Sequence, residues 1–245
     1  MLTPATKPSP SDALDKQGYL SDVDIFRDLA PAEIEALGRR APMRTVPAGT
    51  IFYSPEEPSE VLFILKAGKV RIYRLSVEGK ALTTAIVAAG TIFGEMAILG
   101  QGMHDSYAEA LAPCTLCLMS RDDVKTLLLG DPRIALRITE ILGRRLLEAE
   151  RRLSDFAFKS LPQRLATLLV TLAEREGREP RLFRLGRPEV PEVRYTHEQL
   201  AEMVGGGRET VTKVLNEWRE GGLIELKRGR VVLLDSGALR RLGAG

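Results

Sequence analysis

One long helical run near the middle of the chain constrains the fold more than any other feature of the sequence. Asp131 is suited to cap a helix and Pro132 to fill its first position, and no glycine or proline interrupts the run beyond Gly143. The chain before this run is rich in β-forming residues, and the chain after it is rich in helical patterns. We therefore expect an α+β protein whose two domains are joined by a helix at residues 131–160.

Short β-rich runs fill the stretch from Thr45 to Leu118, where glycine and proline recur at short intervals. They read "TIFYSP", "VLFILKAGKVRIYRL", "KALTTAIVAAGTIF" and "CTLCLMS". This spacing is typical of a compact antiparallel roll or barrel.

A short helix is expected just before the β-rich runs, with Ser21 as N-cap and a restart at Pro31. We assign residues 21–130 to this first domain and residues 1–20, rich in Pro and Ser, to a disordered tail without the apolar stretch of a secretory signal.

Two cysteines, Cys114 and Cys117, form a lone C-x-x-C pattern inside a predicted strand. Side chains three apart on a strand point to opposite faces, and no further ligands accompany the pair, so we expect two buried thiols and no metal site. Free thiols favour a reducing, cytoplasmic setting. No apolar run approaches the roughly 20 residues that span a bilayer, so no membrane contact is expected.

The long helix carries apolar residues at alternating spacings of four and three. This is a coiled-coil seam of about two heptads, and it predicts a helix that pairs with a second copy of the chain. So short a seam also fits a helix packed on its own domain, and that alternative stays open. The predicted dimer interface consists of Leu142, Leu146, Ala149, Leu153 and Phe156.

Charge is divided unevenly along the chain. Residues 1–120 hold 11 Lys and Arg against 14 Asp and Glu, whereas residues 121–245 hold 24 against 19. A polyanionic partner would therefore meet the C-terminal half.

Three glycines, Gly205 to Gly207, separate two helical patterns in residues 161–245. Thr196 and Gln199 form a capping box for the first helix, and a longer helix starts at Arg208. A phosphate-binding loop would need a strand before the glycines and a lysine after them, and neither is present. A helix, a short glycine turn and a second helix instead predict a helix-turn-helix, whose second helix enters the DNA major groove.

The helix after the glycines has one charged and one apolar face. Arg208 and Glu209 lie on its first turn and Lys213 lies one turn later, whereas the apolar residues face the other way. Arginine can bind guanine bidentately, and glutamate can accept from cytosine. The alternative is an ordinary solvated helix face. The apolar side consists of Val211, Val214, Leu215 and Trp218.

A hairpin follows in "LIELKRGRVVLL", with a two-residue turn at Arg228-Gly229. Lys227, Arg228 and Arg230 gather at its tip, where they are placed to contact DNA phosphates.

Taken together, these motifs resemble the cyclic AMP receptor protein and FNR superfamily of bacterial regulators. The resemblance runs from about Ser21 to Leu242 and covers "FILKAGKVRIYR", "AGTIFGEMAIL", the long helix and "GGGRETVTKVL". It implies an N-terminal double-stranded β-roll like a cyclic-nucleotide-binding domain, a dimerisation helix and a C-terminal winged helix-turn-helix. It also implies a homodimeric transcription factor that binds palindromic double-stranded DNA and recruits RNA polymerase. The DNA-binding residues would be Arg208, Glu209, Thr210, Thr212, Lys213, Lys227, Arg228 and Arg230.

The effector pocket fits the family pattern less well. Gly94 and Glu95 match, but the arginine that grips the cyclic phosphate is missing, and its position falls on His104 or Asp105. We therefore assign no certain cofactor, and expect an unliganded competent dimer or a different effector rather than strong cyclic AMP binding. The resemblance places the pocket at Gly94, Glu95, Met96, His104, Asp105, Ser106, Arg145, Ala149 and Glu150.

Two other function classes fit the sequence less well. A nucleotide-sensing module acting on a protein partner would account for the roll but not for the winged helix. An enzyme would need a nucleophile–base pair, a metal-ligand cluster or a phosphate loop, and we identify none, so no catalytic residue is predicted.

Overall fold

The computed structural model describes residues 26, 29–40, 42–57, 61–94, 106–176 and 191–244. The chain forms two compact units, Met1–Arg145 and Leu146–Gly245, which divide within the long helix α5. The expected Ser21 N-cap and the expected tail at residues 1–20 lie outside the described residues.

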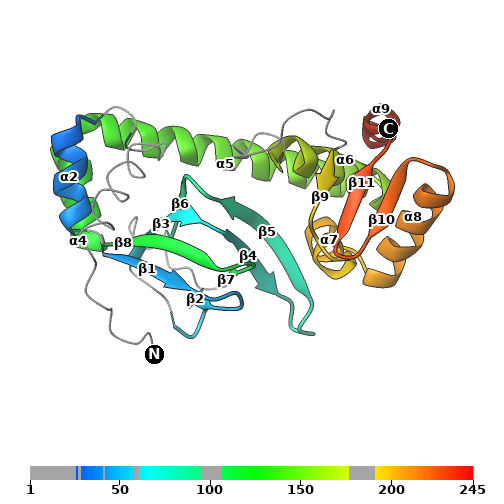
Figure 1. The fold of residues 1–245 in the computed structure, drawn as a ribbon, viewed down its shortest axis with the longest axis horizontal. Helices are drawn as coiled ribbons and strands as arrows, with labels where there is room; N and C mark the ends of the chain where they lie inside the picture. The colour runs from blue at the N-terminus through cyan, green and yellow to red at the C-terminus, as the bar shows by residue number, and fades with distance from the viewer. Residues whose placement is uncertain are drawn as a thin grey trace. The chain divides into compact units, whose positions relative to one another are not determined.

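The N-terminal unit contains two four-stranded antiparallel sheets (Figure 1). Their strand orders are β1-β8-β3-β6 and β2-β7-β4-β5. This confirms the expected antiparallel β-roll. The strands are β1 (Met43–Val46), β2 (Ile51–Tyr53), β3 (Val61–Ala67), β4 (Lys69–Leu75), β5 (Ala81–Ala88), β6 (Thr91–Phe93), β7 (Tyr107–Ala110) and β8 (Cys114–Ser120).

Strand β3 is buried on both faces, and its alternating side chains enter two different cores. Phe63 and Leu65 belong to one cluster, where the Phe63 ring stacks on Phe93 at 4.7 Å between centroids. Leu62 and Ile64 belong to a second cluster that includes residues of the flanking helices. A strand buried on both faces reads as a continuous apolar run, as "VLFIL" does.

The two cysteines divide between the same two clusters. Cys114 lies in the Phe63 cluster and Cys117 in the second cluster, and both thiols are buried and outside any disulfide. Burial raises the pKa of the Cys114 thiol. The expectation that the C-x-x-C side chains point to opposite faces of a strand is confirmed.

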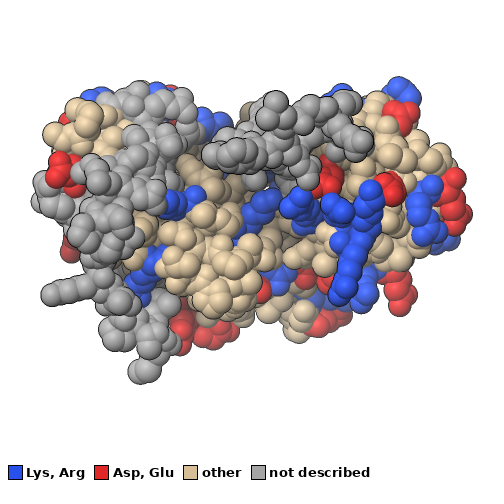
Figure 2. Space-filling model, viewed as in Figure 1, with Lys and Arg blue, Asp and Glu red and all other residues tan. Residues whose placement is uncertain are grey.

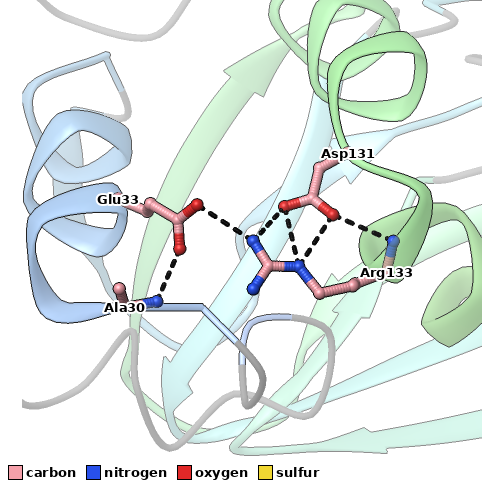
Figure 3. Close-up of polar contacts among 4 residues, drawn as sticks. All are labelled: Ala30, Glu33, Asp131 and Arg133. Atoms are coloured by element: carbon pink, nitrogen blue, oxygen red, sulfur yellow. Dashed lines mark hydrogen bonds and ion pairs between the residues drawn. The ribbon is translucent and has the colours of Figure 1, made fainter.

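Three helices contribute to the second cluster: α2 (Pro31–Arg40), α4 (Arg121–Gly130) and the first half of α5 (Pro132–Phe158). Asp131 caps α5, since its Oδ1 accepts the Arg133 backbone N–H at 2.9 Å. The Arg133 guanidinium also joins Asp131 to Glu33 of α2, at 2.6 and 2.9 Å (Figure 3). The hydrogen bond from the Arg133 side chain lowers the pKa of Asp131. The three charged side chains together tie α2 to the start of α5.

Parts of the roll differ from the expected runs. The run "KALTTAIVAAGTIF" divides at Gly90 into β5 and β6, which belong to different sheets. Strand β7 was not among the expected strands, because "YAEA" has little β-propensity of its own. It is a strand because β2 and β4 pair with it on both sides.

The C-terminal unit is a helix-turn-helix combined with a small antiparallel sheet. Helix α6 (Leu161–Glu176) precedes α7 (His197–Val204) and α8 (Arg208–Glu220), and the wing hairpin of β10 (Ile224–Lys227) and β11 (Arg230–Leu233) follows. Two elements were not expected from the sequence: β9 (Glu192–Val193), which pairs with β11, and α9 (Ser236–Ala244), which packs on α6. The core of the unit includes Leu165, Leu169, Leu200, Val211, Leu215, Trp218, Val231 and Leu239.

A membrane-spanning segment is not found among the described helices, since each is too short or too polar to cross a bilayer.

Candidate nucleic-acid interface

Helix α7 begins and ends as its sequence predicts. The Thr196 side chain accepts from the Gln199 backbone and the Gln199 side chain accepts from the Thr196 backbone, so both halves of the capping box are present. Gly205 ends the helix in the left-handed conformation, at φ 62° and ψ 48°, and its N–H donates to the Ala201 carbonyl. This left-handed ending reverses the chain towards α8, as a helix-turn-helix requires.

The next two glycines differ in their surroundings. A Cβ on Gly206 would lie 2.3 Å from Leu161 Cδ1, so the turn packs directly against the start of α6. Gly207 is the N-cap of α8 in an extended conformation without a side-chain hydrogen bond, and a Cβ there would meet nothing closer than 3.8 Å.

Helix α8 separates its charged and apolar residues between two faces. Val211, Val214, Leu215 and Trp218 are buried, which confirms the expected apolar face. Arg208, Glu209, Thr210 and Lys213 are exposed, and a surface depression follows the helix along their side. The side chain of Arg208 is 70% exposed, and its Nε lies 3.8 Å from the Glu198 carboxylate. The charged residues at the start of α8 are therefore accessible to a large partner.

Thr212 lies at the edge of this charged face and contacts α7. Its hydroxyl is 3.0 Å from His197 Nδ1. Burial lowers the pKa of the His197 imidazole, and the nearby Arg208 charge lowers it further, so the ring is neutral near pH 7. Sequence reasoning missed His197 and Glu198. The available signal was their position on the first turn of α7, which precedes the predicted recognition helix α8 and contacts it.

The hairpin tip carries its three cations on the turn that the sequence predicts, with Gly229 at φ 69°. Lys227 pairs with Glu225 at 2.9 Å, and Arg230 pairs with Glu192 of β9 at 3.3 Å. Arg228 is exposed, and no ion pair joins it to another described residue. Figure 2 shows Lys and Arg in several patches, with Asp and Glu and other residues between them, on the drawn face of the C-terminal unit. Sequence reasoning also missed Glu192, because strand β9 was not expected.

The structure describes only part of the predicted effector pocket. Glu95, Met96, His104 and Asp105 lie outside the described residues. Gly94 has φ 87°, and a Cβ on it would lie 2.5 Å from the Val61 carbonyl oxygen, so the close approach of two backbones requires glycine. Ser106 is partly exposed next to β7; Ala149 and Glu150 are exposed on α5.

Arg145 is the one described cation of that predicted pocket. Its guanidinium donates to the backbone carbonyl of Ile92 in β6. Burial raises the pKa of Tyr53 to about 12, against the opposing effect of the Arg145 charge. Arg145 thus interacts with the interior of its own unit.

The predicted dimer seam changes character along α5. Leu142 is partly buried against the core of the N-terminal unit, whereas Leu146, Leu153 and Phe156 are 63%, 71% and 40% exposed. Ala149 is exposed as well. Within α5, the seam from Leu146 onwards is an apolar strip on the surface of the C-terminal unit.

Known protein families match both units. A model of the cyclic nucleotide-binding domain matches residues 43–131, and a model of the Crp-like helix-turn-helix domain matches residues 163–242. A CRP-like cAMP-activated global transcriptional regulator of Mycobacterium tuberculosis is 30% identical over 226 residues, which cover 91% of this chain and 97% of that protein. The chain belongs to the CRP/FNR superfamily of transcriptional regulators.

Other superfamily members agree along most of the chain. The cyclic AMP receptor protein of Thermus thermophilus is 30% identical over 221 residues, which cover 90% of this chain and 97% of that protein. Among solved structures, the c-di-GMP-responsive global regulator CLP of Xanthomonas campestris superposes with a TM-score of 0.72 at 25% identity, covering 84% of this chain and 100% of that chain. A CRP/FNR-family regulator of Thermus thermophilus superposes with a TM-score of 0.65 at 29% identity, covering 83% and 99%. This CRP/FNR protein is therefore a transcription regulator with a DNA-binding helix-turn-helix domain.

Proposed function

We propose that the protein is a homodimeric, sequence-specific regulator that binds palindromic double-stranded DNA and activates transcription by recruiting RNA polymerase. The observation that carries this proposal is the exposed arrangement of Arg208, Glu209 and Lys213 on the first turns of α8, opposite a buried apolar face. A recognition helix needs this division, because its N-terminal side chains must reach base edges while the helix is held from behind. Arg208 would bind guanine, and Glu209 would accept from cytosine.

The remaining predicted contacts divide between bases and phosphates. Lys213 would reach a further base, where a lysine offers a point charge instead of the planar fork of an arginine. Thr210, Thr212, Lys227, Arg228 and Arg230 would contact phosphates, which set the register and supply salt-dependent affinity.

The exposed strip on α5 supports a dimer. Leu146, Leu153 and Phe156 expose large apolar surface at coiled-coil spacing, and pairing with a second copy would bury it. Two recognition helices related by a two-fold axis would then read a palindrome with half-sites about one helical turn apart.

Cyclic AMP fits the described part of the pocket poorly. Arg145 already interacts with Ile92, Ala149 offers no hydroxyl where the family meets adenine, and Glu150 adds negative charge. The family's arginine that grips the cyclic phosphate is also missing from this sequence. The loss of its charge-assisted hydrogen bond alone weakens binding by about 1.5–3 kcal/mol, which is roughly 10- to 150-fold. We propose a dimer that binds DNA without an effector or responds to a different one, and no step of its action passes through cyclic AMP.

An in vitro selection from random duplexes tests the DNA-reading role. The wild-type protein should select a two-fold site. Arg208→Ala should weaken binding by about 1–3 kcal/mol and lose preference at one base pair per half-site, because one base-edge contact is removed. Arg219→Ala, which removes an exposed arginine from the last turn of the same helix, should leave the preference unchanged. Full base preference in the Arg208 variant would refute the assignment.

Calorimetry with cyclic AMP and cyclic GMP, with and without the selected DNA, tests the effector. We expect neither nucleotide to raise DNA affinity. Saturable cyclic AMP binding that tightens DNA binding would contradict this part of the proposal.

Transcription in vitro from a promoter carrying the selected site, with and without the protein, tests activation.

A further inference from the structure

Arg164, near the start of α6, makes three contacts that join three helices of the C-terminal unit. Its Nε donates to the Val204 carbonyl at 3.0 Å, and its Nη1 donates to the Lys159 carbonyl at 2.9 Å. Its guanidinium carbon lies over the Phe156 ring, 4.9 Å from the centroid. One planar cation thus contacts the last turn of α5, the residue that follows α5 and the last residue of α7.

Both carbonyl groups lie at helix C-termini, where backbone oxygens lack intrahelical partners. Lys159 directly follows α5, and Val204 is the final residue of α7, immediately before the left-handed Gly205. A cation is favourable at such an end because the helix dipole is negative there. Arg164 therefore satisfies the ends of two helices with one side chain.

The connection between α5 and α6 is short and internally bonded. Only Lys159 and Ser160 separate the helices, and the Ser160 N–H donates to the Gln163 side chain at 2.8 Å. Lys159 Nζ pairs with Asp155 at 2.9 Å and donates to Thr167 at 3.2 Å. Two residues held from both sides leave little freedom for α6 to turn relative to the last turn of α5.

The same connection contacts the turn of the helix-turn-helix directly. Leu161 fills the space where a Cβ of Gly206 would lie, and Arg164 holds the Val204 carbonyl two residues earlier. The end of α5 and the turn that aims α8 are therefore coupled through one side of α6. Arginine suits this position because its planar group can stack and donate from two edges at once, whereas lysine can do only part of this.

We propose that Arg164 is a positioning residue that fixes the direction of α7 and α8 relative to the end of the dimerisation helix, and so sets the half-site spacing that the dimer accepts. This inference rests on the proposed function as a dimeric DNA reader. A rigid connection between α5 and α6 raises the effective concentration of the second protomer's recognition helix at one half-site spacing. A loose connection spreads that effective concentration over several spacings.

The test measures spacing preference with the full-length protein. The probes are the two-fold duplex selected by the wild type, the same duplex with one or two base pairs inserted or removed between the half-sites, and a duplex with a single half-site. Arg164→Lys should bind the selected duplex about 10-fold more weakly and bind the altered duplexes almost as before, so its spacing preference falls about 10-fold. Its affinity for the single half-site should change by less than about twofold.

Arg240→Lys is the matched control. Arg240 of α9 also forms an ion pair with α6, at 2.7 Å from Glu174. This pair involves neither the end of α5 nor the end of α7, so the Arg240→Lys protein should keep the wild-type spacing preference. A wild-type spacing preference in Arg164→Lys overturns the inference. So does an equal loss on half-site and full-site DNA, because that would mean that Arg164 only supports the fold of the unit.

Phe156→Leu is the second variant, in case Arg164→Lys does not fold. It removes the ring beneath the guanidinium but keeps the seam position apolar, so light scattering should still show a dimer while the spacing preference relaxes in the same direction. An unchanged preference in the dimeric variant overturns the inference. A wild-type protein that selects no two-fold site would instead refute the proposed function, and this inference would fall with it.

Discussion

At the residue scale, the three consecutive glycines between α7 and α8 differ in how strictly the structure requires glycine. Gly205 adopts a left-handed conformation that disfavours side chains, and a Cβ on Gly206 would displace the Leu161 side chain. Gly207 has an ordinary extended conformation and open space, so nothing in the structure requires glycine there. Substitutions at the three positions should therefore have different effects.

Gly205→Ala should destabilise the C-terminal unit by about 1–2 kcal/mol, because an L-residue is strained in the left-handed region. Gly207→Ser should stabilise it by a few tenths of a kcal/mol, because a serine hydroxyl can cap α8 where glycine has none. Urea unfolding followed by the fluorescence of Trp218, the single tryptophan of the chain, reports on this unit. Equal stability of the two variants would contradict the assignment of Gly205 as the strained position.

His197 makes the stability of the same unit depend on pH. Its pKa in the folded protein lies below the ordinary value of 6.5, so the unfolded chain binds the proton more readily. Stability is therefore complete above pH 6.5 and falls as the pH is lowered from there through the folded pKa. The urea midpoint reported by Trp218 should fall between pH of about 7.5 and about 5.5, and His197→Gln should flatten that dependence. An identical slope in wild type and variant would mean that another group is responsible.

At the element scale, α5 packs differently along its length. Ile134, Ile138 and Ile141 are buried in the N-terminal unit, whereas the seam residues from Leu146 onwards lie on the surface. Apolar periodicity alone cannot separate these two halves, since both show the spacing of a helix with one buried face. The exposed half is the part available to a second chain.

Leu153→Glu should disrupt the proposed dimer, because pairing would bury two unpaired carboxylates in an apolar seam. We expect the dimer dissociation constant to rise by about 100-fold or more, equivalent to about 3 kcal/mol. Ser154→Glu adds the same charge one residue away from the seam and is the control. Light scattering behind size exclusion measures both variants, and a dimeric Leu153→Glu protein would show that α5 does not pair in this way.

At the scale of the whole molecule, the chain has little net charge for a DNA-binding protein. The formal net charge is +2, and many cations of the C-terminal unit are paired, as Lys227 is with Glu225 and Arg230 with Glu192. DNA affinity must then come from the placement of a few cations rather than from the overall charge. Arg228 and Lys213 are exposed, and no ion pair joins either one to another described residue.

Arg228→Gln should reduce the dependence of DNA affinity on salt without changing base preference. Each lost phosphate contact lowers the slope of log K against log salt by about 0.9, so a dimer should lose about 1.8. Binding titrations at several salt concentrations measure the slope. Lys80→Gln, in the N-terminal unit, removes an exposed cation paired with Glu78 and is the control. An unchanged slope in Arg228→Gln would place the hairpin tip away from the phosphates.

Local signals in the sequence were sufficient to predict most of the helix-turn-helix. The Thr196–Gln199 capping box, the short glycine turn and the apolar face of α8 depend on residues only a few positions apart, so the sequence contains the whole interaction. The β-roll was predicted for the same reason, from short apolar runs broken by turn residues. Strand β7 ("YAEA") has no such local signal. It is a strand because β2 and β4 pair with it in the sheet.

The sequence by itself determined most of the helices and strands and which face of α8 is charged, since these follow from propensity and periodicity over a few residues; β7, β9 and α9 were not among them. Only the tertiary structure decided the partners of those faces. It placed Glu192 against Arg230, His197 against Thr212 and Arg164 between the ends of α5 and α7. The physical reason is that hydrogen bonds and ion pairs act over about 3 Å of space and are indifferent to separation along the chain.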